Sequence, residues 1–140
     1  MVPKKYEFID HTADLGFKAY GASIEGLFVN AAECLFDVLV SPKSIEEREK
    51  RVIKVEAGAL DELMVSWLAE LLYLYDTEKL VFKHFEVKRL DDNQIEAIAR
   101  GEVLDSARHE VKTGIKAVTY HRLYVEESEG GWEAQVIFDM

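Results

Sequence analysis

The sequence predicts an α+β fold, with two helices packed on a largely antiparallel sheet in a single domain that spans residues 1–140. Three observations favour this class. Two stretches repeat apolar residues at helical spacing, six or seven others have the alternation or the turn boundaries of strands, and the strands mostly follow one another along the chain. A chain of this length commonly forms one domain with a core of its own. We expect the helices to cover one face of the sheet.

The first three elements are expected before Pro42. Residues 4–9 and 15–20 are predicted as strands, because the second of them alternates apolar and polar side chains as a half-buried strand does. A helix is expected across residues 24–39, where apolar residues recur every three or four positions. Ser23 is a favourable N-cap for this helix, and Pro42 marks the break after it.

The middle of the chain is predicted to hold a connection, a strand and the second helix. Residues 43–51 form a mixed run of charges and are expected to be a solvated connection, whereas residues 53–57 alternate as a strand. Asp61 and Glu62 supply the negative charge that favours a helix N-terminus. The apolar arc of this helix, across residues 63–75, is wide. We therefore expect the helix to be covered on more than one side.

The second half of the chain is predicted to be β. Residues 80–90 and 95–103 flank a polar tetrapeptide, residues 91–94, and together indicate a hairpin. Residues 115–125 and 132–138 alternate in side-chain character, as half-buried strands do. Strands that follow one another so closely in the sequence favour antiparallel pairing.

Composition narrows the range of functions. The chain carries 27 acidic against 17 basic residues, a net charge of −10, which disfavours a broad nucleic-acid surface and favours basic protein partners or divalent cations. Cys34 is the one cysteine, so no internal disulfide forms, and its apolar helical setting indicates a buried hydrophobe. The sequence shows neither an apolar signal segment nor a membrane span, and a cytoplasmic protein is expected.

The motif HTADLG, residues 11–16, places several polar groups in a tight break between the first two strands. A turn needs only an Asp and a Gly, so the added histidine and hydroxyl suggest a ligand. Asp139 and the terminal carboxylate of Met140 give a second group of oxygens at the end of the last strand. If the two ends meet, Asp14 and Asp139 provide the hard donors that Ca²⁺, Mg²⁺ or Mn²⁺ prefer. The alternative is that Asp14 caps the turn and Asp139 is solvated.

The segment KTGIKAVTYHR, residues 112–122, is the most basic part of this acidic chain. It is either an exposed polar strand face or a contact for a phosphate or a partner, with Lys116 as a point charge near the carboxylates. His11, Lys116 and His121 are the candidate contact residues. The sequence has no Gly-rich phosphate loop, no metalloprotease motif and no evident nucleophile–base pair, so no catalytic residue is predicted.

Four motifs together resemble the archease family: HTADLG, the helix sequence DELMVSWLAELLY, GEVLDSARHEVKTGIKAVTYH and the terminal VIFDM. The likeness covers essentially the whole chain. It implies an α+β fold built as an elaborated strand-helix-strand-strand unit. It also implies a bound divalent cation, calcium, with Asp14, Asp139 and the main-chain oxygens of Met140 as its ligands. By the same resemblance Lys116, in IKAVTYH, becomes a functional candidate.

The resemblance implies an accessory protein rather than an enzyme. Members of the family assist the RtcB-type RNA ligase that joins tRNA exons, and they promote guanylylation of the ligase and its repeated turnover. Some members are linked to RNA methyltransferases, as chaperones that keep these enzymes soluble and specific. An acidic helper can dock on a basic RNA enzyme without competing for RNA, so no direct nucleic-acid binding is expected. A metal-dependent hydrolase that uses Asp14, Asp139 and His121 is the third hypothesis.

Overall fold

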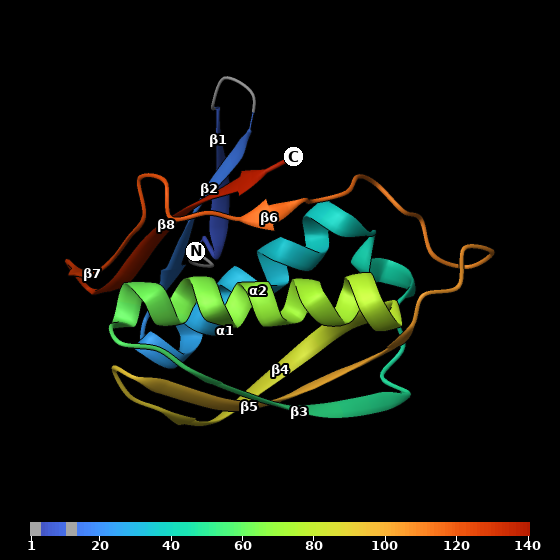
Figure 1. Ribbon diagram of the computed structural model, residues 1–140, viewed down its shortest axis with the longest axis horizontal. Helices are drawn as coiled ribbons and strands as arrows, with labels where there is room; N and C mark the ends of the chain where they lie inside the picture. Colours follow the sequence, from blue (N-terminus) through green and yellow to red (C-terminus); the bar gives the residue numbers. More distant parts are fainter. Residues whose placement is uncertain (1–3, 11–13) are drawn as a thin grey trace.

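The computed structural model describes residues 4–10 and 14–140, and these residues form three layers (Figure 1). The elements, in chain order, are β1 (Tyr6–Asp10), β2 (Leu15–Gly21), α1 (Ile24–Leu39), the short 3-10 helix η1 (Pro42–Ser44), β3 (Glu49–Glu56), α2 (Leu60–Glu78), β4 (Leu80–Leu90), β5 (Gln94–Val103), β6 (Ala117–Val118), β7 (Tyr124–Ser128) and β8 (Gly131–Asp139). Both helices lie between two antiparallel sheets and contact both of them. The predicted class of two helices packed on antiparallel strands is confirmed, but the strands form two sheets rather than the one expected.

The first sheet contains β1, β2 and β8 in that order, and β6 and β7 both pair with the far side of β8. All of these pairings are antiparallel. β2 and β8 run side by side along the whole length of β2, from Leu15 opposite Phe138 to Gly21 opposite Trp132. This register places the start of β2 beside the end of β8.

The second sheet covers the other side of the helices, with the order β3-β5-β4. Its inner face buries alternate residues of β5, among them Ile95, Ala97 and Ala99, as the period of a strand requires. β4 and β5 approach closely at Gly101, where an added Cβ would lie 1.9 Å from the carbonyl oxygen of Val81. Only glycine fits there, so the end of β5 is fixed against β4.

The helices begin where the sequence predicts. The Ser23 hydroxyl accepts the N–H of Gly26 at 3.1 Å and caps α1, and Asp61 and Glu62 lie in the first turn of α2. The indole N–H of Trp67 donates to the carbonyl of Phe28 at 3.0 Å and joins the two helices inside the core. No helix within the described residues has the length and apolar character needed to cross a membrane.

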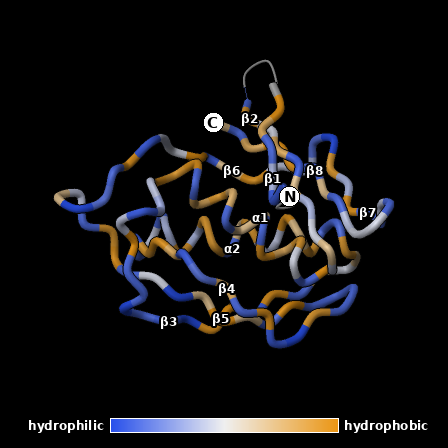
Figure 2. Tube along the Cα trace, turned by 180° about the vertical axis from the view of Figure 1, so that it is seen from behind, coloured by the Kyte–Doolittle hydropathy of each residue, from blue (hydrophilic) through white to orange (hydrophobic). Residues whose placement is uncertain are grey.

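The buried core is formed by apolar residues of both helices and of both sheets. Figure 2 shows hydrophobic residues recurring along the helices and strands, with many hydrophilic residues in the segments between them. The wide apolar arc expected of the second helix is confirmed. α2 buries residues on several of its sides because one sheet lies above it and the other below: Leu63, Met64, Val65, Trp67, Leu68, Leu71, Leu72 and Leu74. This two-sided burial is the reason that the strands divide into two sheets.

Two sequence-based boundaries are corrected by the structure. Residues 49–51, expected in a solvated connection, are the first residues of β3, where they pair with β5. Residues 115–125, expected as one strand, contain the two-residue strand β6, a turn and the first two residues of β7. Five residues, 119–123, lie between the partners of Phe138 and Gln135, where β8 has only two. The side chains of residues 115–125 alternate in character as in one strand, because β6 and β7 both pair with β8 and the turn between them does not interrupt the alternation.

The turn between β6 and β7 is held by local bonds. The Thr119 hydroxyl donates to the carbonyl of Ile137 at 2.8 Å, and the N–H of Leu123 donates to the carbonyl of Tyr120 at 3.3 Å. Arg122 has a φ of 52°, in the left-handed region. Few non-glycine residues adopt this conformation outside turns, so the backbone here cannot continue a strand.

Candidate functional site: the carboxylate end of the first sheet

Two predicted ligands meet at one end of the first sheet. Leu15 and Phe138 are cross-strand partners, Asp14 precedes the former and Asp139 follows the latter. In an antiparallel pair, directly opposite residues have Cα atoms about 4.5–5.5 Å apart, so the next positions along the two chains are also neighbours. The structure thus brings Asp14, the last residue of the HTAD motif, beside Asp139. Their role as metal ligands stays a prediction.

Lys116 joins the same end from the neighbouring strand. Its N–H donates to the carbonyl of Asp139 at 2.8 Å, and Ala117 is the cross-strand partner of Asp139. The structure therefore places the main chain of Lys116 next to that of Asp139, on adjacent segments of one sheet. The role of Lys116 as a point charge near the carboxylates stays a prediction.

The donors at this end suit a hard cation. Asp139 is exposed and, among the described residues, makes no ion pair, while Asp14 is half-buried. The side chain of Met140 packs against the core, which holds the main chain after Asp139 in place. Two neighbouring carboxylates repel each other unless a cation lies between them. Carboxylate and main-chain oxygens are the ligands that Ca²⁺ and Mg²⁺ prefer, so the residues fit a divalent cation of that kind.

Side chains alone do not complete such a site within the described part of the chain. There, no three His, Cys, Asp or Glu side chains gather closely enough to hold a metal ion. Within the described residues, the further donors next to Asp14 and Asp139 are main-chain oxygens, such as those of Met140. His11, the remaining candidate in the HTAD motif, lies outside the described residues.

His121 is exposed and lies in the turn between β6 and β7, not on a strand as the sequence suggests. Its N–H donates to the Thr119 hydroxyl at 3.2 Å, which fixes its backbone in the turn. The structure thus brings Asp14 and Asp139 together with the main chain of Lys116, and His121 lies in the turn that follows β6.

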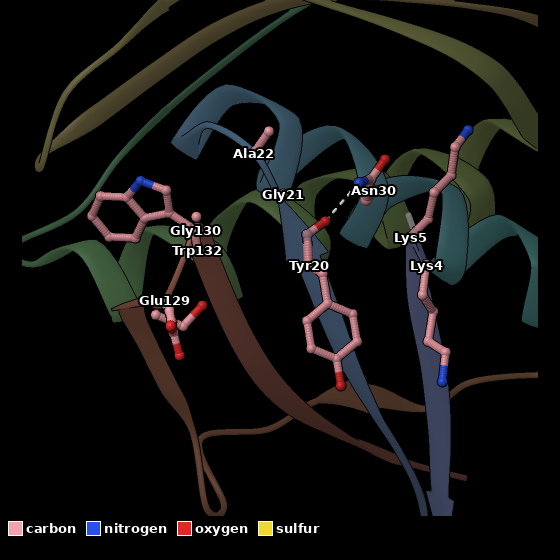
Figure 3. A pocket seen from close by; sticks show the side chains of 11 residues that line it. Lys4, Lys5, Tyr20, Gly21, Ala22, Asn30, Glu129, Gly130 and Trp132 are labelled. Atoms are coloured by element: carbon pink, nitrogen blue, oxygen red, sulfur yellow. Dashed lines mark hydrogen bonds between the residues drawn. The ribbon is translucent and has the colours of Figure 1, made fainter. Parts of the chain in front are cut away.

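A pocket of about 430 Å³ lies at the opposite end of the same strands (Figure 3). Gly21 at the end of β2 and Trp132 at the start of β8 help to line it, together with Lys4 and Lys5. The amide of Asn30 donates to the carbonyl of Tyr20 at 2.6 Å at its edge. The length of seven strand residues, about 23 Å, separates this pocket from the carboxylate end, so the pocket is not part of that site.

Sequence analysis missed a buried polar cluster. Glu102 and His109 are only 3% and 4% exposed, and the carboxylate of Glu102 lies 2.9 Å from Nε2 of His109. By strand alternation Glu102 belongs to the outer face of β5, where a carboxylate is unremarkable. Its burial arises because Glu46, Arg108 and His109 close around its carboxylate. Arg108 and His109 belong to residues 104–116, which we call the strap and which run from the end of β5 past the ends of the helices to β6 (Figure 1). The sequence does offer one signal for this cluster: Glu102 is followed, six and seven residues later, by Arg108 and His109, two side chains that can bond a carboxylate.

Comparison with known proteins finds relatives that match nearly the whole chain. The model of the archease protein family matches residues 6–140. A curated archease from Methanosarcina mazei is 40% identical over 141 aligned positions, which cover 98% of this chain and 97% of that protein.

Two solved structures are similar. A solution structure of a Methanobacterium thermoautotrophicum protein is 37% identical, has a TM-score of 0.84, and the match covers 97% of this chain and 99% of that one. A crystal structure from Thermotoga maritima, of an archease described as a possible chaperone, has a TM-score of 0.66 with 94% of both chains covered. At 21% identity the second likeness concerns the fold alone.

Proposed function

The chain belongs to the archease family, and on that premise we propose that it is an accessory protein of an RtcB-type RNA ligase. In this proposal it promotes guanylylation of the ligase and its repeated turnover, and it is not itself an enzyme. Membership of the family over the whole chain supports an accessory role. The net charge of −10 supports docking on a basic RNA enzyme, without direct binding of nucleic acid.

The proposal assigns a divalent cation to the carboxylate end of the first sheet. Asp14, Asp139 and main-chain oxygens of Met140 would hold it, with calcium as the first choice and magnesium or manganese as alternatives. Such a cation would supply a positive charge at the surface that a phosphate group or a partner's carboxylate can approach. Lys116 would add a second positive charge beside it, and His11 and His121 are further candidate contacts.

One observation carries the proposal: Asp14, Asp139 and Lys116 come from distant parts of the chain and converge at one end of a sheet. Asp14 precedes β2, Lys116 precedes β6 and Asp139 ends β8, so all three lie where strands of one sheet begin or end. Polar groups that converge at the ends of elements on a rigid scaffold are typical of a functional surface.

A second candidate function is that of a chaperone or specificity factor for a tRNA methyltransferase. The description of the Thermotoga maritima archease as a possible chaperone favours it. Retention of the methyltransferase rather than the ligase from a lysate of the source organism would support this alternative. Turnover of a phosphoester by the protein alone, with added metal, would instead favour the hydrolase hypothesis.

The ligase proposal is tested by guanylylation of the ligase with substoichiometric amounts of this protein. Native protein should stimulate the reaction through several turnovers. Asp14→Asn and Asp139→Asn should each reduce the stimulation at least tenfold, because each removes one carboxylate charge from a cation site. Glu129→Gln is the matched control, since Glu129 is an exposed carboxylate beside the pocket at the far end of the same sheet.

Equal loss in all three variants would show that general acidity, not the carboxylate end, matters. Full stimulation by the two Asp variants would remove Asp14 and Asp139 from the function.

A further inference from the structure

Glu102 and His109 are the buried charged or polar side chains within residues 4–10 and 14–140. One oxygen of Glu102 accepts the N–H of Glu46 at 2.6 Å and faces Nε2 of His109 at 2.9 Å, and the other accepts the guanidinium of Arg108. Burial raises the pKa of Glu102, but the hydrogen bonds from Arg108, Glu46 and His109 outweigh it and lower the pKa to about 2. The carboxylate is therefore ionised and fully paired.

The hydrogen bonds fix the state of the His109 ring. Its Nδ1 accepts the N–H of Asp105 at 2.8 Å, so Nδ1 carries no proton. Nε2 must then carry the proton, and it donates to Glu102. The same turn is closed by the N–H of His109, which donates to the carbonyl of Asp105 at 2.7 Å. The ring thus acts as a two-sided link between the strap and the end of β5.

The surrounding charges complete the cluster. Arg48 lies 3.8 Å from the Glu102 carboxylate and also bonds Glu46, and Arg108 lies 3.6 Å from Asp105. The two arginines and two outer carboxylates surround the buried pair from the strap and from residues 46–48. No other element contributes a charged side chain to Glu102 among the contacts that the structure describes.

The strap also bonds to other elements along its length. It passes the end of α1 and reaches β8, and both its side chains and its main chain contact these elements. The Lys112 ammonium donates to the Asp37 carboxylate at 2.9 Å, and Ile115 is buried. Main-chain bonds hold it as well. The N–H of Leu104 donates to the carbonyl of Lys79 at 2.7 Å, and the N–H of Ser41 donates to the carbonyl of Glu110 at 2.9 Å. Further along the strap, the N–H of Lys112 donates to the carbonyl of Leu39 at 2.9 Å and that of Lys116 to the carbonyl of Asp139 at 2.8 Å.

A buried carboxylate with its hydrogen-bonding partners is poor evidence of added stability, because apolar residues of the same volume often serve as well or better. Its best-attested benefit is to specify one arrangement among several. The strap has no regular secondary structure beyond a single bridge between Val111 and Val40, so its register depends on separate bonds. Among these, the Glu102–His109 contact is the one that joins two buried polar side chains within the described residues. If it slipped by one residue, Lys116 would lose its bond to Asp139 and point elsewhere.

We propose that the Glu102–His109 pair is a latch that fixes the register of the strap, and thereby holds the main chain of Lys116 on that of Asp139. Glu102 and His109 are positioning residues, because neither touches the carboxylate end. The placement of Lys116 by the latch does not depend on the proposed function. Its consequence for ligase stimulation does rest on that function.

The test uses amide resonances of the full-length protein in native form and as Glu102→Gln, which keeps the side-chain volume but loses the charge. In this variant we expect the amides of Asp105 and His109 to exchange with solvent at least ten times faster. The amide of Lys116, at the other end of the strap, should exchange faster too and change its chemical shift. Glu78→Gln is the control, because it breaks the exposed Arg51–Glu78 ion pair, which lies outside the strap.

A second pair of variants, both at His109, distinguishes loss of the latch from general unfolding of the protein. His109→Gln keeps an N–H donor toward Glu102 and should leave the Lys116 amide near its native shift, whereas His109→Ala should displace it. A local structural role predicts no such rescue at a distance. Changes confined to residues 44–48 and 102–110, with Lys116 unchanged, would overturn the proposal.

The ligase assay separates this inference from the proposed function. If native protein stimulates guanylylation, Glu102→Gln should stimulate it several-fold less, and equal stimulation by the two would overturn the latch as a positioning device. If native protein fails to stimulate, the proposed function falls, and the Lys116 amide alone decides the latch.

Discussion

Carboxylates lie at both ends of the strap, in opposite environments. Glu102, at its start, is buried and accepts from an arginine, a histidine and a main-chain N–H. Asp139, at its end, is exposed next to Asp14, with no ion pair of its own among the described residues. A buried carboxylate survives only if every lone pair is satisfied, so such a cluster serves the fold. The exposed Asp139, next to the half-buried Asp14, lies where a ligand can reach it.

The largest expected difference concerns stability. Glu102→Ala removes one partner of the buried pair and leaves the His109 and Glu46 donors unsatisfied, so we expect a loss of about 3–5 kcal/mol in the free energy of unfolding. Denaturation by urea, followed by circular dichroism, measures it. A loss below about 1 kcal/mol would show that water replaces the carboxylate easily and would weaken the contrast with Asp139.

A fall in pH should destabilise the Glu102 cluster, because the carboxylate becomes protonated. The pKa of Glu102 is about 2 in the folded protein and close to its ordinary value of 4.5 in the unfolded chain. A lowered pKa means that the stabilisation is fully present above pH 4.5 and is lost as the pH falls toward 2. Exchange of the Asp105 and His109 amides should therefore quicken between these values. Glu102→Gln should show no such step, and a step of equal size in that variant would assign the effect to another group.

The second anchor of the strap should contribute less. Lys112 is partly exposed where it meets Asp37, so Lys112→Met should cost about 0.5 kcal/mol in the free energy of unfolding. Urea denaturation measures this loss beside that of Glu102→Ala. A cost as large as that of Glu102→Ala would show that the Lys112 anchor, not the latch, dominates the strap.

The smallest effect on stability is expected at the carboxylate end. Asp14→Ala should change the free energy of unfolding by no more than about 0.5 kcal/mol, as surface substitutions usually do, while ligase stimulation falls at least tenfold. Circular dichroism and the guanylylation assay follow the two quantities on one sample. Loss of helix and sheet signal in Asp14→Ala would make this residue structural, like Glu102.

Much of the fold could be predicted from local sequence. Ser23 and the acidic start of α2 mark helix N-termini by chemistry that acts within one turn. The turn at residues 119–123 could not be predicted, because alternation continues across it and only pairing with β8 reveals the extra residues. The division into two sheets depends on which strands pair, and that is settled by long-range packing.

The same limit applies to the sites. The donor chemistry of Asp14 and Asp139 is legible in the sequence, but their proximity depends on the pairing of β2 with β8. Glu102 was harder to find, since strand alternation assigns it to the solvent face. Only the path of the strap buries it, and residues without regular structure give no periodic signal.

The central claim is that Asp14 and Asp139 share a divalent cation. Titration of calcium into the native protein, followed by amide resonances, tests it most directly. The account predicts saturable shifts centred on Leu15, Lys116 and Asp139, absent from Asp14→Asn and unchanged in Glu129→Gln. Shifts of equal size in Asp14→Asn, or none in the native protein with calcium, magnesium or manganese, would contradict it.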